Sequence, residues 1–214
     1  MVSDLLADLN PQQKQAVLKT DGPVLILAGA GSGKTRVLTY KVAYLIKEKG
    51  VDPQNILMAT FTNKAAGEMK ERIAKLLTHN PQLTIHNLPF AGTFHSLCAK
   101  ILRIEGKHLG IPANFLIYDE EDSLAAVKEA MRKLDVSTKD FNPSSILTTI
   151  SGAKNELISA LEYPQYSRGY FQEVASRVYL AYQKILKDNQ ALDFDDLLMS
   201  TVRLFKKEAL VLAK

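Results

Sequence analysis

The sequence predicts an α/β fold in which part of a parallel sheet carries an inserted, all-helical subdomain. Two observations predict this fold. Over the first 110 residues, apolar runs of strand length alternate three times with helical patterns. Because parallel strands need long crossover connections, usually helices, the alternation favours a parallel sheet. After Gly110 the helical patterns follow one another almost without strands.

The first helix, strand and loop follow from residues 10–50. Asn10 before Pro11 is an N-cap with proline in the first helical position, which predicts a helix over 11–19. The run VLILA (24–28) is continuously apolar and bounded by turn residues, so we predict a fully buried parallel strand. The next helix is expected over 33–49, with Gly50 as its C-terminal cap.

The same strand and helix pattern then repeats twice. NILMAT (55–60) predicts a second buried strand, and residues 63–77 predict a helix. FAGTF (90–94) predicts a weaker third strand that leads into another helix. These elements complete the predicted core over residues 1–110.

Helices dominate the predicted insertion, residues 111–191. They are expected over 119–135, 143–157 and 168–189, and FLIY (115–118) is the one strand-like run. The segment 192–214 returns to the core through a last helix, whose first turn holds acids that suit the helix dipole.

Composition narrows the class of protein. Hydrophobic residues make up 46% of the chain and charged residues 23%, as in ordinary globular proteins. No run approaches the ~20 apolar residues of a membrane span, and the amino-terminal segment lacks the basic start of a secretory signal. Cys98 is the one cysteine, which excludes an intrachain disulfide and favours a reducing compartment. We expect a cytoplasmic protein without a membrane partner.

Net charge is +4, and the segment 61–110 alone is +4 from seven Lys and Arg against three Glu. A basic segment fits a polyanion partner, and it fits solvated helix faces equally well.

A phosphate-binding loop is predicted at LAGAGSGKTR (27–36), between the predicted strand and helix. The pattern G-x-x-x-x-G-K-[ST] is intact in its second half, while Ala28 replaces the first glycine. Small residues let backbone N–H groups point at phosphate oxygens, and the helix N-terminus adds a favourable dipole. Lys34 would reach the β and γ phosphates, and the Thr35 hydroxyl would hold Mg²⁺. The alternative is a glycine-rich turn without a ligand.

Four ordered motifs resemble one family. AGAGSGKTR resembles the Walker A motif of superfamily 1 DNA helicases of the UvrD/Rep/PcrA type, and LNPQQKQAV (9–17) resembles their upstream glutamine motif. ATFTNKAAGEMKERI (59–73) is similar to motif Ia and GTFHSLCAKILR (92–103) to motif Ib. LDFDDLL (192–198) is similar to the segment that returns from the insertion. The resemblance implies a RecA-like P-loop NTPase domain, called 1A, interrupted by a helical subdomain, 1B.

The resemblance implies ATP and Mg²⁺ as cofactors. Gln13 presents one donor and one acceptor, the arrangement that reads the edge of adenine, and the family assigns it that role; a plain exposed helix residue is the alternative. Arg36 is planar and charged, and its family counterpart packs against adenine. The implied nucleotide site comprises Gln13, Ala28, Gly29, Ala30, Gly31, Ser32, Gly33, Lys34, Thr35 and Arg36.

The resemblance also implies contacts with single-stranded DNA at the ends of two predicted strands. Phe61 would stack a base, and Thr62 and Asn63 would donate to phosphates. Thr93 and His95 lie at the corresponding edge of the third predicted strand, so the same kind of contact with single-stranded DNA is expected of them. Without the resemblance, Phe61 would be read as a core residue and Thr62 as an N-cap.

Three other groups of residues are read as structural. Cys98 beside His95 is interpreted as packing rather than a nucleophile. Asp193, Asp195 and Asp196 are interpreted as a capped helix start with solvated acids rather than metal ligands. Most of the aromatic residues of the insertion are expected in its core rather than on a DNA-stacking surface. The residues concerned are Tyr163, Tyr166, Tyr170, Phe171, Tyr179 and Tyr182.

Parts of the family pattern are missing. No Asp-Glu pair follows a buried strand, so the Walker B acids are not recognised, and neither is a second motor domain. We expect this to be the N-terminal portion of a helicase, with little or no hydrolysis alone. In the intact enzyme, ATP hydrolysis would drive 3′–5′ translocation on single-stranded DNA and unwinding at single-strand/duplex junctions. The alternatives are a RecB/AddA-like nuclease-helicase, a non-catalytic nucleotide- or DNA-binding module, and an unrelated phosphate-loop kinase.

Overall fold

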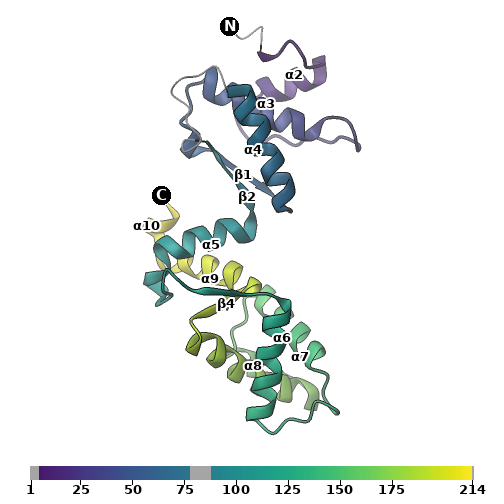
Figure 1. Cartoon of the computed structure of the whole chain (residues 1–214), viewed down its shortest axis with the longest axis vertical. Coiled ribbons are helices and arrows are strands. Elements are labelled where there is room, and N and C mark those ends of the chain that lie inside the picture. Colours follow the sequence, from purple (N-terminus) through teal and green to yellow (C-terminus); the bar gives the residue numbers. More distant parts are fainter. Residues whose placement is uncertain (1–4, 78–87, 214) are drawn as a thin grey trace. The chain divides into compact units, whose positions relative to one another are not determined.

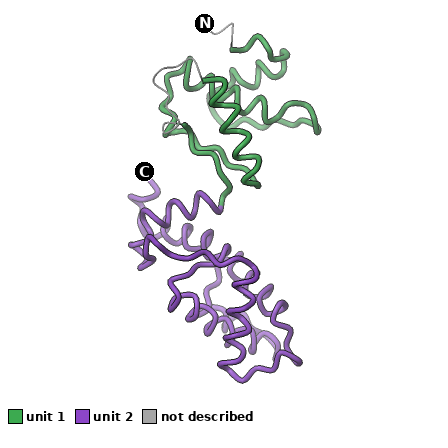
Figure 2. The backbone as a smooth tube through the Cα atoms, viewed as in Figure 1, with its two compact units in different colours: residues 1–94 green, residues 95–214 purple. Residues whose placement is uncertain are grey.

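The computed structural model describes residues 5–77 and 88–213. The chain divides into two compact units, residues 1–94 and 95–214 (Figure 2). Residues 1–4, where we predict no secretory signal, and residues 78–87, part of the basic segment 61–110, lie outside the described residues. No helix among the described residues is long and apolar enough to cross a membrane.

The first unit contains a two-stranded parallel sheet covered by helices. β1 (Leu57–Thr60) and β2 (Phe90–Thr93) pair in register from Leu57 opposite Phe90 to Thr60 opposite Thr93. The helix α4 (Asn63–Leu77) packs on both strands and on α3 (Figure 1). The remaining elements are α2 (Pro11–Leu18), α3 (Lys34–Lys47) and the 3₁₀ turn Pro53–Asn55.

The fit of α4 to the sheet follows from its sequence pattern. Its buried residues recur at intervals of three and four, so one stripe of the helix is apolar. Ile73 and Leu77 are 1% and 2% exposed and pack in the cluster that includes Met58 and Ala91 of the two strands. Burying each of the two aliphatic side chains contributes roughly 2 kcal/mol. The predicted strands at 55–60 and 90–94 and the helix at 63–77 are therefore confirmed.

The predicted first strand, at residues 24–28, is wrong. The segment forms no strand, and Leu25 and Leu27 are 83% and 86% exposed. Among the described residues, no backbone hydrogen bond reaches residues 24–27. A strand is held by the ladder of hydrogen bonds from its neighbour, and the described sheet contains only β1 and β2. The apolar run therefore has no pairing partner among the described residues, although Ile26 packs against the cluster that contains Val17 and Val37.

The second unit is mainly helical, as predicted, but it is not all-helical. β3 (Leu116–Tyr118) confirms the strand-like run at 115–118, and it pairs in parallel with β4 (Ala191–Asp193). We did not predict β4, because three residues are too few to show a periodic pattern. The helices are α5 (Phe94–Glu105), α6 (Glu120–Lys133), α7 (Pro143–Asn155), α8 (Tyr170–Asp188), α9 (Phe194–Lys207) and α10 (Ala209–Leu212), with 3₁₀ turns at Gly106–Leu109 and Tyr163–Gln165.

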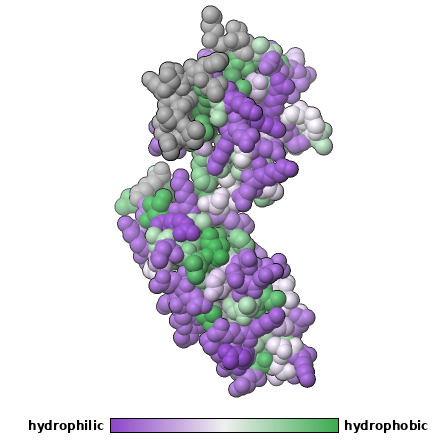
Figure 3. Space-filling view, in the orientation of Figure 1, coloured by the Kyte–Doolittle hydropathy of each residue, from purple (hydrophilic) through white to green (hydrophobic). Residues whose placement is uncertain are grey.

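The core of this unit lies between α6, α7 and α8. Tyr179 and Tyr182 are fully buried there, whereas Tyr166 and Tyr170 are 60% and 74% exposed. Tyr163 is also buried, and Phe171 packs against the same cluster. The prediction that most of these aromatic residues lie in the core is therefore confirmed. Hydrophobic side chains gather over β3 on the face seen in Figure 3, because both Leu116 and Ile117 are partly exposed.

Candidate functional site

The loop at residues 29–33 bends because two of its glycines adopt left-handed backbone angles. Gly31 has φ +76° and Gly33 has φ +89°, a region that residues with a Cβ rarely enter. The bend leads directly into α3, whose first residue is Lys34. The first N–H groups of a helix have no partner within it, so they face the loop side as donors for an anion.

The side chain of Lys34 folds back over this loop. Its Nζ donates to the carbonyl oxygens of Ala28 and Gly29, at 2.8 and 2.7 Å. The Ser32 hydroxyl also donates to the Gly29 carbonyl, at 2.7 Å. Among the described residues, no carboxylate pairs with Lys34. An ammonium without an acidic partner therefore lies beside the donors of the helix N-terminus, which is an arrangement suited to phosphate.

Thr35 is exposed in the first turn of α3, next to Lys34. Its hydroxyl is a hard oxygen ligand of the kind that Mg²⁺ accepts, and Mg²⁺ usually keeps several waters and phosphate oxygens. The described residues contain no group of three acidic, histidine or cysteine side chains that could hold a metal by itself. The chain therefore fits a shared magnesium site rather than a cage of its own.

Gln13 connects α2 to the loop. Its Nε2 donates to the Ser32 carbonyl at 3.0 Å, and its Oε1 accepts from the backbone N–H of Asn10 at 3.2 Å as part of a capping box. Both ends of the amide are therefore engaged. A Cβ built on Gly33 would lie 2.8 Å from Gln13 Nε2, so an alanine there would have to displace the end of the Gln13 side chain, in addition to the strain of the left-handed backbone angle.

Arg36 is held within the first unit. Its Nη2 donates to the Asp8 carbonyl at 2.9 Å, and its guanidinium carbon lies 5.4 Å from the centre of the Tyr40 ring. The side chain remains 46% exposed. The guanidinium thus lies over the Tyr40 ring. Its predicted contact with adenine stays a prediction.

Two exposed aromatic rings lie just beyond the carboxyl ends of the paired strands. Phe61 follows β1 and is 92% exposed, and Phe94 follows β2 and is 50% exposed. Their ring centres are 6.5 Å apart, because the register places Thr60 opposite Thr93. Phe61 is therefore not the core residue that its hydrophobicity alone suggests. We missed Phe94, although parallel pairing of the two predicted strands would have indicated it.

Thr62 and Asn63 lie beside this aromatic pair, at the start of α4. Thr62 caps the helix, since its Oγ1 accepts from the Ala65 N–H at 3.2 Å. Asn63 is the exposed first residue of α4. Thr62 thus has a structural role whether or not it contacts a ligand.

Thr93 and His95 flank Phe94 in the sequence but differ in their surroundings. Thr93 ends β2 and is partly buried. His95 begins the second unit, where its ring meets Phe194 edge-on at 5.5 Å. Cys98, one turn later, is buried as expected for packing.

The acids at 193–196 form the predicted capped helix start, but Asp193 and Asp196 are each 5% exposed, so the prediction that these acids are solvated is wrong for both. Asp193 and Asp196 make a capping box at the beginning of α9. Both carboxylates also bind the buried Lys154, whose Nζ lies 2.6 Å from Asp193 Oδ2 and 2.9 Å from Asp196 Oδ1. Lys154 already pairs with both carboxylates, and the described residues contain no group of three side chains that could hold a metal, so no metal site is assigned here.

One protein family matches almost the whole chain. The family described as "UvrD/REP helicase N-terminal domain" matches residues 9–214. The chain belongs to this family. Membership confirms the predicted fold class, a RecA-like α/β domain with short parallel sheets and much helix.

Individual relatives agree with the family assignment. A Bacillus subtilis (strain 168) protein named ATP-dependent DNA helicase PcrA is 50% identical over 205 residues, covering 96% of this chain. Proteins of the same name from Staphylococcus aureus (strain Mu50) and Staphylococcus epidermidis are 44% and 43% identical over 203 residues, 95% of this chain. The chain spans 27% of the length of each of these relatives.

Proposed function

We propose that this chain is the ATP-binding, N-terminal part of a DNA helicase. In the longer protein, ATP hydrolysis would drive 3′–5′ translocation on single-stranded DNA and unwinding at single-strand/duplex junctions. The observation that carries the proposal is the glycine bend at Gly31 and Gly33, with the ammonium of Lys34 held over it and no acid paired to it among the described residues. The UvrD/REP family match supplies the class of reaction.

Each residue of the loop has a proposed task. The N–H groups of residues 29–35 would bind the phosphates of ATP, and Lys34 would leave the Ala28 and Gly29 carbonyls to reach the β and γ phosphates. The Thr35 hydroxyl would be one ligand of Mg²⁺, which neutralises charge on those phosphates. Gln13 and Arg36 would contact the adenine while Gln13 keeps the loop in place.

The proposed DNA surface is the carboxyl edge of β1 and β2. Phe61, with Phe94 beside it, would stack unpaired bases, which costs no rearrangement of the core because both rings are already exposed. Thr62, Asn63, Thr93 and His95 would contact the sugar–phosphate backbone. We place this activity in the cytoplasm.

A nucleotide titration tests the proposal. The 214-residue chain should bind a fluorescent ATP analogue in the presence of Mg²⁺, and Lys34→Ala should weaken binding by at least about tenfold, since charge-assisted bonds to phosphate contribute ~1.5–3 kcal/mol. Lys128→Ala removes an exposed lysine of α6 and is the matched control. Equal affinity of the parent and Lys34→Ala, with unchanged circular dichroism, would refute the loop assignment.

A measurement of phosphate release from ATP tests whether this chain hydrolyses ATP by itself or only as part of a longer protein. We expect the 214-residue chain to bind ATP with little or no turnover, with or without single-stranded DNA, because the described residues bring no acidic side chain to Lys34. The longer protein should show DNA-stimulated hydrolysis. A full-length protein that binds ATP and DNA but never hydrolyses would favour a non-catalytic module.

A further inference from the structure

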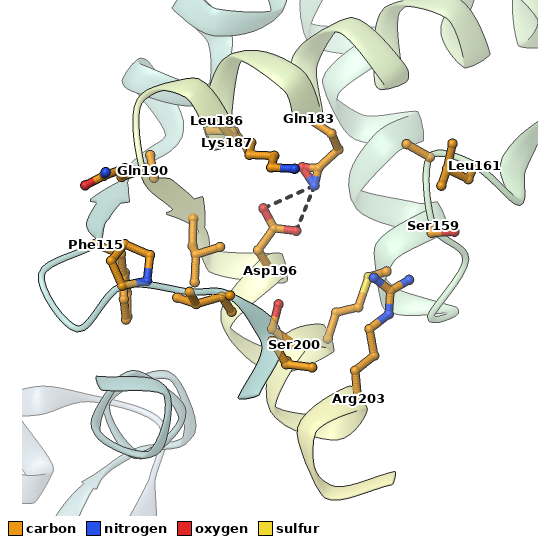
Figure 4. A pocket seen from close by; sticks show the side chains of 18 of the residues that line it. Phe115, Ser159, Leu161, Gln183, Leu186, Lys187, Gln190, Asp196, Ser200 and Arg203 are labelled. Carbon is orange, nitrogen blue, oxygen red and sulfur yellow. Dashed lines mark hydrogen bonds between the residues drawn. The ribbon is translucent and has the colours of Figure 1, made fainter. Parts of the chain in front are cut away.

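A hollow of about 670 Å³ lies in the second unit, and none of its lining residues belongs to the loop or the aromatic pair. It is formed by residues 109–115, the C-terminal half of α8, the β4–α9 segment and residues 159–161 (Figure 4). This volume falls within the range of small-molecule sites, roughly 300–1,000 Å³. Nothing in the proposed function uses this hollow.

Apolar side chains form part of the wall of the hollow, beside polar ones such as Ser159 and Gln190. Phe115, Leu186 and Met199 line it, and each is only 2–3% exposed because the rest of its surface packs into the core. Leu197 and Leu204, deeper in the same wall of α9, are also buried. A hollow that is already formed can bind a flat or compact apolar body without prior rearrangement.

The floor carries a buried carboxylate. Asp196 lines the hollow but is only 5% exposed, and Gln183 Nε2 donates to its Oδ1 at 3.1 Å (Figure 4). Behind it, Lys154 is shared between Asp196 and Asp193. Tyr182 donates to Asp193 as a neutral phenol, at 2.7 Å. Two carboxylates and one ammonium leave this buried group with one negative charge in excess when both acids are ionised.

The mouth of the hollow does not cancel this excess. Arg203 lines it, but its guanidinium is already 3.9 Å from the carboxylate of Glu162. Lys187 also lines the mouth and is exposed to water, where its charge is screened. The uncompensated charge nearest the apolar walls therefore belongs to the Asp196 group, and a buried charge gains most from an opposite charge placed beside it.

We propose that this hollow is a binding site for a small organic cation, an amine or amidine on an aromatic or aliphatic body. The apolar body would pack against Phe115, Leu186 and Met199, and the cationic N–H groups would donate to Asp196. None of the residues that line the hollow belongs to the proposed nucleotide site, so this proposal can fail while the proposed function holds, and the reverse.

The test is a titration followed by ¹H–¹⁵N NMR on the whole 214-residue chain, with benzamidine as the probe. Benzamidine should cause saturable shifts of amides lining the hollow, such as those of Ala191 and Ser200. Benzoate has the same shape and the opposite charge, and benzamide is the neutral match. We expect benzamidine to bind at least about tenfold more tightly than benzoate.

Two variants sharpen the experiment. Ser200→Phe puts a ring into the hollow and should abolish the shifts, whereas Ser145→Phe, on the exposed face of α7, should leave them unchanged. Asp196→Asn keeps the shape and should remove the preference for benzamidine over benzoate. The comparison of Ser200→Phe with Ser145→Phe tests whether benzamidine binds in the hollow even if Asp196→Asn fails to fold.

Three results would overturn the proposal. Benzamidine without saturable shifts, or with shifts that survive Ser200→Phe, would show that the hollow does not take this ligand. Equal affinities for benzamidine and benzoate would show an apolar groove without charge selection, suited to an apolar protein segment instead.

Discussion

Gln13 donates a hydrogen bond to the carbonyl oxygen of Ser32, 3.0 Å away, and so fixes the phosphate loop to the helix that precedes it in the chain. The residue expected to read adenine is therefore also a structural support of the loop that would hold the phosphates. Removing it should disturb both functions together.

Gln13→Ala should weaken ATP binding by about fivefold or more, because a net hydrogen bond contributes ~1 kcal/mol and the loop loses its tether. Calorimetric titration with ATP and Mg²⁺ measures the change. Gln12→Ala, an exposed neighbour on α2, is the control. Matching affinities in the two variants would contradict a special role for Gln13.

Gly33→Ala should destabilise the loop by about 1–2 kcal/mol, since the new Cβ enters a left-handed conformation and meets Gln13 Nε2 at 2.8 Å. Nucleotide affinity should fall with it. The matched control is Gly67→Ala in α4, where nothing lies within 4 Å of the new Cβ and the helix should gain ~1 kcal/mol. Urea unfolding of both variants gives the comparison, and equal effects would exclude local strain at Gly33.

Phe61→Ala should weaken the binding of a single-stranded oligonucleotide by about tenfold, since stacking on an aromatic ring contributes ~1–3 kcal/mol per base. Phe94→Ala should act in the same direction. Fluorescence anisotropy at two salt concentrations measures affinity, and Phe61→Tyr, which keeps the stacking face, should bind like the parent. Loss of affinity in Phe61→Tyr but not in Phe61→Ala would point away from stacking.

Lys154→Met should destabilise the second unit by about 3–5 kcal/mol, because it leaves two buried carboxylates without their cation. Denaturant unfolding reports this loss. Lys184→Met breaks an exposed pair with Asp188 and should change little, since water screens that pair. Comparable losses of unfolding free energy in both variants would mean that the buried ion pairs stabilise the unit no more than the exposed pair does.

Burial raises the pKa of Asp196 to about 6 from 3.8, despite the attraction of Lys154. Folding therefore favours the protonated acid, so this contribution to stability is fully present below pH 3.8 and is lost as the pH rises through about 6. Between pH 7 and pH 4, the unfolding free energy of the parent should rise by about 2 kcal/mol relative to Asp196→Asn. Parallel pH curves for the two proteins would contradict the raised pKa.

Local sequence patterns predicted the elements whose stabilising contacts lie close by in the chain. The helix 63–77 was correct to the residue because its apolar stripe and its capping threonine are both local features. The strand at 24–28 was wrong because an apolar run shows a tendency to be buried but does not show whether a neighbouring strand is present.

Contacts between distant parts of the chain could not be predicted. Lys154 lies far along the chain from the two acids it binds, and no local pattern marks a buried lysine. The hollow beside Asp196 depends in the same way on four separate segments meeting. The phosphate loop was found because its glycines and lysine are consecutive, whereas the partner of Gln13 had to be observed.

The unpaired backbone of residues 24–27 affects how this chain should behave in concentrated solution. Among the described residues, the amide and carbonyl groups of residues 24–27 have no backbone partner, and beside the exposed side chains of Leu25 and Leu27 they form a template on which a second copy can add a strand. Self-association through this segment should grow with protein concentration. A partner that pairs as a strand with residues 24–27 should therefore suppress this self-association.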